Sequence, residues 1–301
     1  MTPVADPPVS PYRSYRKDLL AKDQVRAFST LRPAVAVRDA AWCWAGIVAA
    51  WTLVAYCPTW WAVLIALPVI GTRYHGLYII GHDGLHRRVF ESERWNDWFT
   101  DLFVLGPIGA ITRINNRNHL THHRHLCTPA DPDRHKHGTA GKTTRSAVLG
   151  YLTGLTSAVR SAANVFLRRG AAPVSAQPTR PAGYTVRDLA IVLGWQAALF
   201  GGLTWAIGWW AYPVLWWLPV YTFTFLGDNF RTFCEHSQPE PDDLADRHRL
   251  ITFDSHPLER LFVAPMNMNY HAVHHLWPSV PYYNLPAADR ATRDLPAAGR
   301  L

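Results

Sequence analysis

The chain has 301 residues, of which 49% are hydrophobic and 17% are charged, and its formal net charge is +8. Its four cysteines are scattered and contain no CxxC pair, so they form no disulfide framework and no zinc knuckle. The positive charge comes without a basic motif interleaved with aromatic residues and without a glycine-rich phosphate loop, so no nucleic-acid partner is expected.

The apolar residues fall in uncharged blocks long enough to cross a bilayer, which takes about 20 helical residues. In chain order, residues 1–38 are polar and mixed in charge, and they are predicted to form a cytoplasmic N-terminal lead with a short helix between Tyr15 and Phe28. The predicted fold class is all-α and integral to the membrane, with four transmembrane helices in two hairpins. These helices belong to one membrane domain, residues 39–301, with spans at 40–56, 60–80, 189–207 and 212–226.

The region between the two hairpins is mostly polar. It contains two semi-apolar stretches, Trp95–Ile111 and Ala147–Phe166, that are interrupted by Gly, Pro, Asp or Arg, and this pattern predicts helices lying in the membrane interface. A basic loop from Asp133 to Arg145 separates the two stretches, and residues 170–183 are predicted to be a linker. Together with the tail after Asp228, this region is expected to form a cytoplasmic, histidine-rich helical cap.

The turns of both hairpins, around Pro58 and Gly208, carry no Lys or Arg, whereas the N-terminal lead, the middle region and the tail carry essentially all of them. The positive-inside rule therefore predicts that both termini and the middle region are cytoplasmic. We expect a multi-pass protein in the lipid bilayer of a bacterial inner membrane or of the endoplasmic reticulum.

Three histidine clusters lie in segments predicted to be cytoplasmic and close to the membrane. The first has HxxxH spacing and follows the second span, and the other two have HxxHH spacing. On a helix, residues i, i+3 and i+4 point to one side of one turn, so each cluster is predicted to hold its imidazoles together. The metal ligands predicted from the clusters are His82, His86, His119, His122, His123, His271, His274 and His275.

The number of ligands narrows the choice of metal. Neutral imidazole suits zinc, copper, iron and nickel alike. A structural zinc takes four ligands and a catalytic zinc takes three and a water, so one zinc would leave half of these histidines unused. Two metals of higher coordination number, with positions left for oxygen, use them all. At a membrane surface this favours a non-haem di-iron site that activates O2, and a di-zinc site fits the same count.

The three histidine boxes in this order, flanked by pairs of spans, resemble the membrane fatty acid desaturase family, which includes related hydroxylases and carotenoid ketolases. The resemblance runs from about Arg73 to Pro286. It includes the sequence HHRHLCTPADPD from His122 to Asp133 and the sequence NYHAVHHLWPSVPYYNLP from Asn269 to Pro286. Val273 departs from the family pattern, since many relatives carry an acidic residue there.

The resemblance implies a ninth ligand, His236, two Fe²⁺ ions as cofactors, and no catalytic residue beyond the metal ligands. It implies an enzyme that uses O2 and external electrons to desaturate an apolar acyl chain, most simply in a fatty acyl lipid. The chain contains no HPGG haem motif, so a separate donor of the ferredoxin or cytochrome b5 type, with its reductase, is expected. The alternative is a hydroxylase or ketolase acting on a lipid, a carotenoid or a specialised metabolite. Outside this class, a non-catalytic histidine-rich metal-binding or transport protein stays open.

Ligating histidines usually donate their second N–H to a neighbouring oxygen. Some of the polar residues near the ligands are therefore expected to be such partners: Asp83, Asp228, Glu235, Asn267 and Asn269. Asp131-Pro132-Asp133 is predicted to shape a turn. The histidines expected to lie outside the ligand set are His125, His135, His137, His248 and His256. A cleft between the spans is expected to be lined by Leu77, Tyr78 and Trp217.

Overall fold

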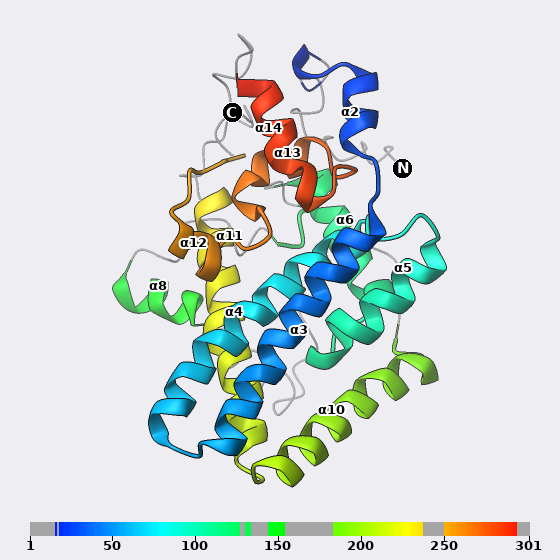
Figure 1. The fold of residues 1–301 in the computed structure, drawn as a ribbon. Coiled ribbons are helices and arrows are strands. Elements are labelled where there is room, and N and C mark those ends of the chain that lie inside the picture. Colours follow the sequence, from blue (N-terminus) through cyan, green and yellow to red (C-terminus); the bar gives the residue numbers. More distant parts are fainter. Residues whose placement is uncertain are drawn as a thin grey trace, which may run out of the picture.

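The computed structural model describes residues 16, 18–126, 130–133, 144–153, 183–236 and 250–293, and these residues contain helices and no strand. Two long antiparallel helices, α3 (Pro33–Tyr56) and α4 (Trp60–Leu85), run side by side through the bundle (Figure 1). They are joined by the short turn at 57–59, as predicted for the first hairpin. Helix α3 begins seven residues before its predicted span, because Pro33 suits the first turn of a helix.

Helix α4 lies at the centre of the fold, and small residues on its surface let its neighbours approach closely. A β-carbon on Gly71 would lie 2.3 Å from the β-carbon of Phe223, and one on Gly84 would lie 2.4 Å from the hydroxyl of Thr100. Both distances are far below van der Waals contact, so only glycine permits this packing. The close approach fixes the end of α4, where the first histidine box lies.

The second long pair of helices begins with α10 (Val186–Ala206). A continuous helical stretch follows from residue 211 to 236, made of two π-helical segments, η3 (Pro213–Trp217) and η4 (Val220–Phe225), and then α11 (Leu226–His236). The predicted span ended at residue 226, but the helix continues for ten more residues. This extension carries His236 to the same end of the bundle as the end of α4.

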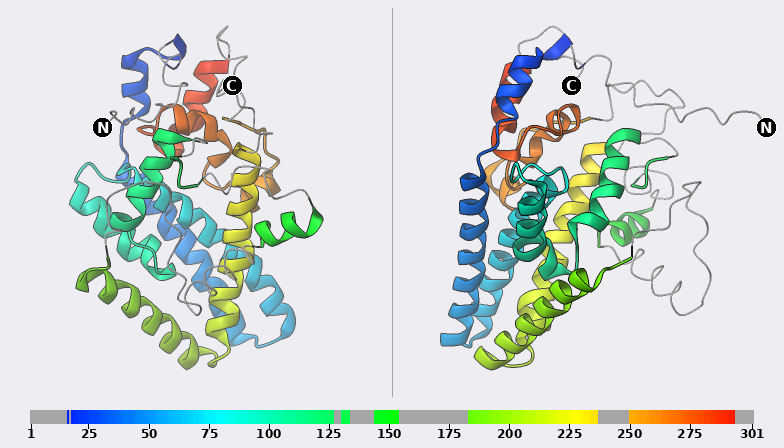
Figure 2. Two further views of the ribbon diagram at one scale, coloured as in Figure 1. Left: turned by 180° about the vertical axis from the view of Figure 1, so that it is seen from behind. Right: turned by 90° about the vertical axis from the view of Figure 1, so that its right-hand side faces the viewer.

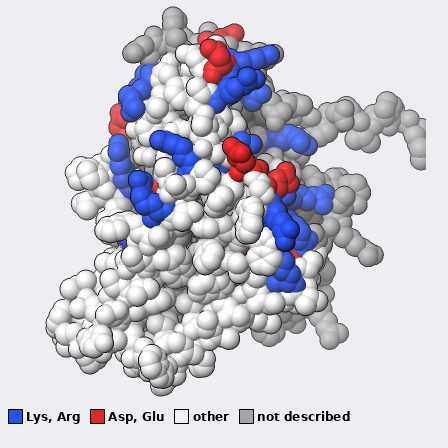
Figure 3. All heavy atoms as spheres, turned by 45° about the vertical axis from the view of Figure 1, so that its right-hand side comes forward, with Lys and Arg blue, Asp and Glu red and all other residues white. Residues whose placement is uncertain are grey.

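Among the described residues, the charged ones lie away from the hairpin turns. Residues 40–72 and 189–227 contain no Asp, Glu, Lys or Arg. Figure 3 shows the charged side chains gathered over the upper part of the molecule and none over the lower part, where the ends of the hairpins lie. Two helices, α4 and α10, are long and apolar enough to cross a membrane.

Shorter helices cover the charged end. These are α5 (Glu93–Thr100), η1 (Asp101–Leu105), η2 (Gly106–Ile108), α6 (Thr112–His125), α8 (Arg145–Leu152), α12 (Pro257–Phe262), η6 (Met268–Tyr270), α13 (His271–Leu276), η7 (Tyr282–Asn284) and α14 (Leu285–Arg293). The predicted interfacial stretch Trp95–Ile111 corresponds to α5, η1 and η2, and α8 covers the start of the second stretch. The rest of that stretch, most of the basic loop and nearly all of the linker lie outside the described residues.

The N-terminal helix α2 (Lys22–Phe28) contacts α14 at the charged end, and the right-hand view of Figure 2 shows the two close together. The hydroxyl of Tyr283 accepts a hydrogen bond of 2.6 Å from the backbone N–H of Arg32, and the hydroxyls of Ser29 and Ser279 lie 2.8 Å apart. These contacts join the two ends of the chain over the histidine-bearing helices. Residues 16, 18 and 19 are helical as well, so the predicted N-terminal helix is present with a break at residues 20–21.

Candidate metal centre

Four helices bring the nine predicted ligands to one end of the bundle. His82 lies in the last turn of α4 and His86 is the residue that ends that helix. Helix α6 carries the second box, α11 ends with His236, and α13 is made almost entirely of the third box. The three histidine boxes lie on helices or at a helix end, as their HxxxH and HxxHH spacing predicted. The site is buried: among these residues His82, His122, His123, His236, His271, His274 and His275 are all exposed over less than a tenth of their surface.

The first set of histidines consists of His82, His86, His119, His123 and His274, which we call the five-histidine group. One ring nitrogen from each of them lies within 4.8 Å of the others. The Nε2 atom of His119 lies 2.8 Å from that of His86 and 3.1 Å from that of His123. His123 and His274 bring their Nε2 atoms to 3.2 Å. Five nitrogen atoms from three helices therefore converge on one point.

The second set consists of His122, His236, His271 and His275, which we call the four-histidine group. Nitrogen atoms of His122, His236 and His275 lie within 4.8 Å of one another, and Glu235, His236 and His271 satisfy the same criterion. The Nε2 atoms of His236 and His271 are 2.9 Å apart. The imidazole of His275 stacks on that of His123 at 4.1 Å between ring centroids, so the two groups lie next to each other.

Each HxxHH box is divided between the two groups. His119 and His123 enter the five-histidine group while His122 enters the other; His271 and His275 enter the four-histidine group while His274 enters the first. At 3.6 residues per turn, positions i and i+4 lie close together on a helix and position i+3 lies to the other side of i. The prediction was that the imidazoles of each box lie on one side of one turn, and the structure adds that each box serves two adjacent groups.

The nitrogen atoms suit metal ions. Burial, together with neighbouring histidines, lowers the pKa values of His86, His123, His271, His274 and His275 well below the ordinary value, so these imidazoles are neutral. Neutral imidazole is the form that binds metals. A proton can bridge one pair of facing nitrogen atoms, but it cannot satisfy five that converge. Moreover, neither ring nitrogen of the buried His275 has a hydrogen-bond partner among the described residues. Two adjacent groups fit two ions, and ligation by all nine residues stays a prediction.

Asp131 contacts the four-histidine group from outside. Its carboxylate accepts a hydrogen bond from Nδ1 of His122, at 3.0 and 3.2 Å to its two oxygen atoms, and another of 2.8 Å from the backbone N–H of Asp133. The bond to Asp133 closes the turn that the sequence predicted at residues 131–133. The first bond was not predicted, because a loop nine residues after a histidine gives no sign of folding back onto it.

A buried ionic network supports the other side of this group. The guanidinium of Arg231 donates to both carboxylate oxygens of Glu235, at 2.8 and 2.7 Å, and to Asp228 at 2.6 Å. Glu235 lies 3.3 Å from Nε2 of His271. Burial raises the pKa of Glu235 to about 8, and the guanidinium opposes this rise. The sequence analysis did not select Arg231, although its spacing from Asp228 and Glu235 places all three on one face of α11.

The other polar neighbours hold backbone rather than imidazoles. Asp83 accepts a 2.7 Å hydrogen bond from the backbone N–H of Tyr282, and its carboxylate lies 4.0 Å from His82. Asn267 and Asn269 donate to the carbonyls of Tyr282 and Phe253. Glu235 lies nearest a ligand imidazole, and its carboxylate approaches the same Nε2 atom of His271 that faces His236, so it adjoins the four-histidine group itself.

The remaining histidines lie outside both groups where they are described. His125 is buried in α6 and His256 is exposed at the start of α12. His135, His137 and His248 fall outside the described residues. His75, which lies two turns before His82 on α4, is buried with Nδ1 at 3.1 Å from the carbonyl of Phe262.

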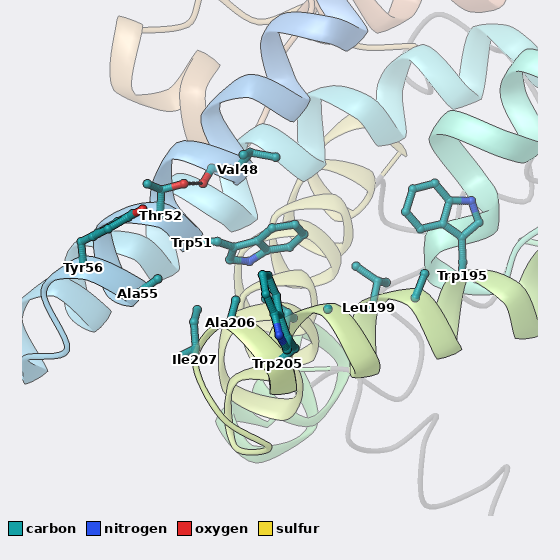
Figure 4. Close-up of a pocket in the computed structure, with 13 residues that line it drawn as sticks. Val48, Trp51, Thr52, Ala55, Tyr56, Trp195, Leu199, Trp205, Ala206 and Ile207 are labelled. Carbon is teal, nitrogen blue, oxygen red and sulfur yellow. Dashed lines mark hydrogen bonds between the residues drawn. The ribbon is translucent and has the colours of Figure 1, made fainter.

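Two cavities adjoin the histidines. One has a volume of about 310 Å³ and the other about 70 Å³, and both are lined by Tyr78, His82 and His119. Of the three residues expected to line a cleft, Tyr78 does so, whereas Leu77 and Trp217 line neither cavity. A larger apolar groove of about 610 Å³ lies between α3 and α10, where Trp51 and Trp205 face each other (Figure 4), and no histidine lines it.

Comparison with known proteins identifies what the chain is similar to. The family model described as fatty acid desaturase matches residues 58–301. A dihydrorhizobitoxine desaturase of Bradyrhizobium elkanii is 26% identical over 276 residues, which cover 85% of this chain and 74% of the relative. A beta-carotene ketolase of a Paracoccus species is 26% identical over 254 residues, covering 80% of this chain and 88% of the relative. The same enzyme from another Paracoccus strain is 28% identical over 216 residues, covering 70% and 72%.

Proposed function

Because the chain belongs to the fatty acid desaturase family, we propose that it is a membrane di-iron oxidoreductase that uses O2 and external electrons to desaturate an aliphatic chain. A fatty acyl lipid is the first substrate to test, and the electrons are proposed to come from a separate ferredoxin or cytochrome b5 type of donor. The family membership confirms the resemblance seen in the three histidine boxes. Its members are membrane-bound oxidoreductases.

The observation that carries the proposal is the division of nine histidines, seven of them buried, into two adjacent groups. A single-metal structural site would need only four of them. When bound, two iron ions supply the O2-dependent oxidation that removes hydrogen from an unactivated C–H bond. The arrangement is therefore richer in nitrogen ligands than a structural metal site requires.

The residues of the chain hold and orient these imidazoles. Asp131 fixes the ring of His122 through its Nδ1–H, which leaves Nε2 available for an ion. Glu235, itself held by Arg231, lies against His271. The cavity beside His82 and His119 gives an aliphatic substrate a place away from bulk water, where the competing reactions of an oxidising centre with solvent are suppressed.

The proposed membrane placement has four spans, residues 40–56, 60–80, 189–207 and 212–226, which correspond to parts of α3, α4, α10 and the helical stretch 211–236, with the histidine groups on the cytoplasmic side. Support comes from the absence of charge in residues 40–72 and 189–227 and from the charge-free lower part of Figure 3. The turn at 57–59 contains a native cysteine, Cys57, which is expected to react with an impermeant maleimide from the non-cytoplasmic side only. Labelling from the cytoplasmic side instead would show that the protein has the opposite orientation in the membrane.

Oxygen insertion is the second candidate reaction, since two of the relatives are beta-carotene ketolases. Desaturation and oxygen insertion both begin by removing a hydrogen from an aliphatic carbon, and they differ in whether a second hydrogen leaves or oxygen is added. The iron-binding residues do not separate the two outcomes, because both would use the same histidine groups. The mass of the product separates them.

The test compares total lipids and small metabolites, by mass spectrometry, from hosts that express the protein or its His122→Ala variant together with a compatible reductase. A species that lacks two hydrogens and depends on His122 supports desaturation, and one that gains oxygen supports the second candidate. If the purified protein binds no iron, the di-iron proposal is wrong. If His122→Ala forms the product as well as the unchanged protein does, the assignment of this histidine is wrong.

A further inference from the structure

Glu235 places a carboxylate among the ring nitrogens of the four-histidine group. It precedes His236 at the end of α11, and its side chain is buried. Its Oε2 atom lies 3.3 Å from Nε2 of His271, and that same nitrogen lies 2.9 Å from Nε2 of His236. One carboxylate oxygen of Glu235 and one ring nitrogen from each of these two histidines all lie within 4.8 Å of one another.

The two nitrogen atoms of His271 have different surroundings. Nδ1 lies 3.4 Å from the sulfur of Met268 and 3.5 Å from a guanidinium nitrogen of Arg231. Nε2 faces His236 and Glu235, so it is the nitrogen directed at the other members of the group. A carboxylate that only orients a metal-binding imidazole approaches the outer nitrogen, because it accepts the second N–H of the ring. Glu235 instead approaches the inner nitrogen.

Asp131 has the outer position in the same group and makes the contrast clear. Its carboxylate accepts a hydrogen bond of 3.0 Å from Nδ1 of His122, which leaves Nε2 of that ring for an ion. The ring of His122 therefore separates Asp131 from the other nitrogen atom of that histidine. Glu235 has no such ring in front of it, since its oxygen lies directly beside Nε2 of His271. The two carboxylates next to the four-histidine group thus have different positions.

The distances around His271 fit ligands of a single ion. An imidazole nitrogen or a carboxylate oxygen binds a metal such as zinc at roughly 2.0–2.2 Å, so two neighbouring ligands at a right angle lie about 3 Å apart. The separations of 2.9 Å to His236 and 3.3 Å to Glu235 are close to this value. Without a metal, the one hydrogen that Nε2 of His271 can carry would make a linear bond to only one of these two neighbours.

The charges around Glu235 also favour a cation at this position. The guanidinium of Arg231 donates to both oxygen atoms of Glu235, at 2.8 and 2.7 Å, and to Asp228 at 2.6 Å. One positive charge is thus shared by two carboxylates, whereas buried charges in proteins are normally paired or bound to metals. A carboxylate has about four acceptor positions, and Arg231 occupies two of those of Glu235. The others can bind an ion.

We propose that Glu235 is a direct ligand of the ion held by the four-histidine group, so that this group offers four nitrogen atoms and one carboxylate oxygen. The five-histidine group offers five nitrogen atoms, and its described members are all histidines. The two ions would have equal numbers of protein ligands and unequal charge, since only one of them binds a carboxylate. This inference rests on the proposed function and adds a residue to its metal site. It replaces the expectation that Glu235 orients a ligand from outside.

The test uses Co²⁺ as the only metal, because its visible absorption depends on the number and type of its ligands. The full-length protein in detergent is titrated with Co²⁺ in the absence of O2, and the bound metal is counted by elemental mass spectrometry. Glu235→Gln keeps the size of the side chain and an oxygen that can accept from Arg231, and it removes the charged ligand. Asp131→Asn is the matched control, because it removes the charge of the carboxylate behind His122.

We expect the unchanged protein to bind two Co²⁺ ions. Glu235→Gln should lower the affinity for one of them by more than the roughly 10–100-fold that loss of an outer partner causes, and it should change the visible spectrum of the fully loaded protein. Asp131→Asn should lower the affinity for one ion and keep the shape of the spectrum. If Glu235→Gln does not fold, the double variant Arg231→Met with Glu235→Gln removes the same ligand without leaving the guanidinium buried.

A Glu235→Gln protein that binds two Co²⁺ ions with the spectrum of the unchanged protein overturns the inference and leaves the two-metal site intact. Equal spectral changes in Glu235→Gln and Asp131→Asn also overturn it, because a ligand and an outer partner would then be indistinguishable. An unchanged protein that binds one Co²⁺ ion or none contradicts the two-metal site of the proposed function, and the inference falls with it. Binding of Co²⁺ needs neither iron nor O2, so the result does not depend on which reaction the enzyme performs.

Discussion

Replacing Asp131 with asparagine separates the two hydrogen bonds of its carboxylate. The backbone N–H of Asp133 donates to Oδ1 at 2.8 Å, and a side-chain amide oxygen can keep that bond and the turn that it closes. Nδ1 of His122 lies within 3.2 Å of both carboxylate oxygens. The Asp131→Asn variant therefore keeps the turn, and it removes the negative charge that holds the ring and increases the basicity of its other nitrogen.

Loss of such an outer partner usually lowers metal affinity by about 10–100-fold, which corresponds to roughly 1.4–2.8 kcal/mol. Because His122 belongs to the four-histidine group only, the loss should fall on one of two ions. We expect the iron content of Asp131→Asn to fall toward half that of the unchanged protein during stepwise titration with a chelator, measured by elemental mass spectrometry. The second half of the iron should resist the chelator as before.

Asp131→Ala is the control, since it removes both hydrogen bonds. It should lower the melting temperature of the metal-free protein as well as the iron content, whereas Asp131→Asn should change the iron content alone. If Asp131→Asn keeps its full iron at every chelator concentration, Asp131 only shapes the turn, and the argument from the contact with His122 is refuted.

Three further predictions concern stability, each measured by thermal unfolding in detergent. Arg231→Met leaves the Glu235 carboxylate buried without its partner, so it should destabilise the protein by about 3–5 kcal/mol. Adding Glu235→Gln should recover part of this loss. An unchanged melting temperature would contradict the ionic network of Arg231 and Glu235. Gly71→Val should destabilise the protein by at least about 1–3 kcal/mol, because the new β-carbon would overlap Phe223. The control is Gly201→Val in α10, whose β-carbon would meet nothing within 4 Å and should be tolerated. Equal losses of stability in the two variants would refute the packing argument. The metal-free protein should lose stability as the pH falls below about 6.5, because burial lowers the pKa values of histidines in the folded state and unfolding then takes up protons. With several such histidines, the free energy of unfolding should fall by more than the roughly 1.4 kcal/mol per pH unit of a single group. A free energy of unfolding that does not change between pH 7.5 and 5.5, in roughly the range where histidine titrates, would contradict the burial of these histidines in their neutral form.

The sequence by itself determined the family, the helical character of the boxes and the uncharged blocks. These features depend on spacing along the chain: HxxHH repeats place histidines on one turn, and uncharged blocks such as 40–56 are recognisable without knowing their neighbours. For the same reason the sequence predicted that α4 carries His82 beyond its apolar part, since a helix continues until a residue interrupts it.

Only the tertiary structure decided how the histidines are shared. Helix periodicity separates His122 and His274 from the i and i+4 members of their boxes, but which histidines of the other helices they join depends on how α6 and α13 pack against the end of α4. Other contacts also join residues that are distant along the chain or whose helix faces are set by packing. They are the hydrogen bond between Asp131 and His122, the approach of Arg231 to within 3.5 Å of Nδ1 of His271, and the cavity beside His82 and His119. Such contacts depend on which faces meet, and close approaches such as that at Gly71 determine those faces.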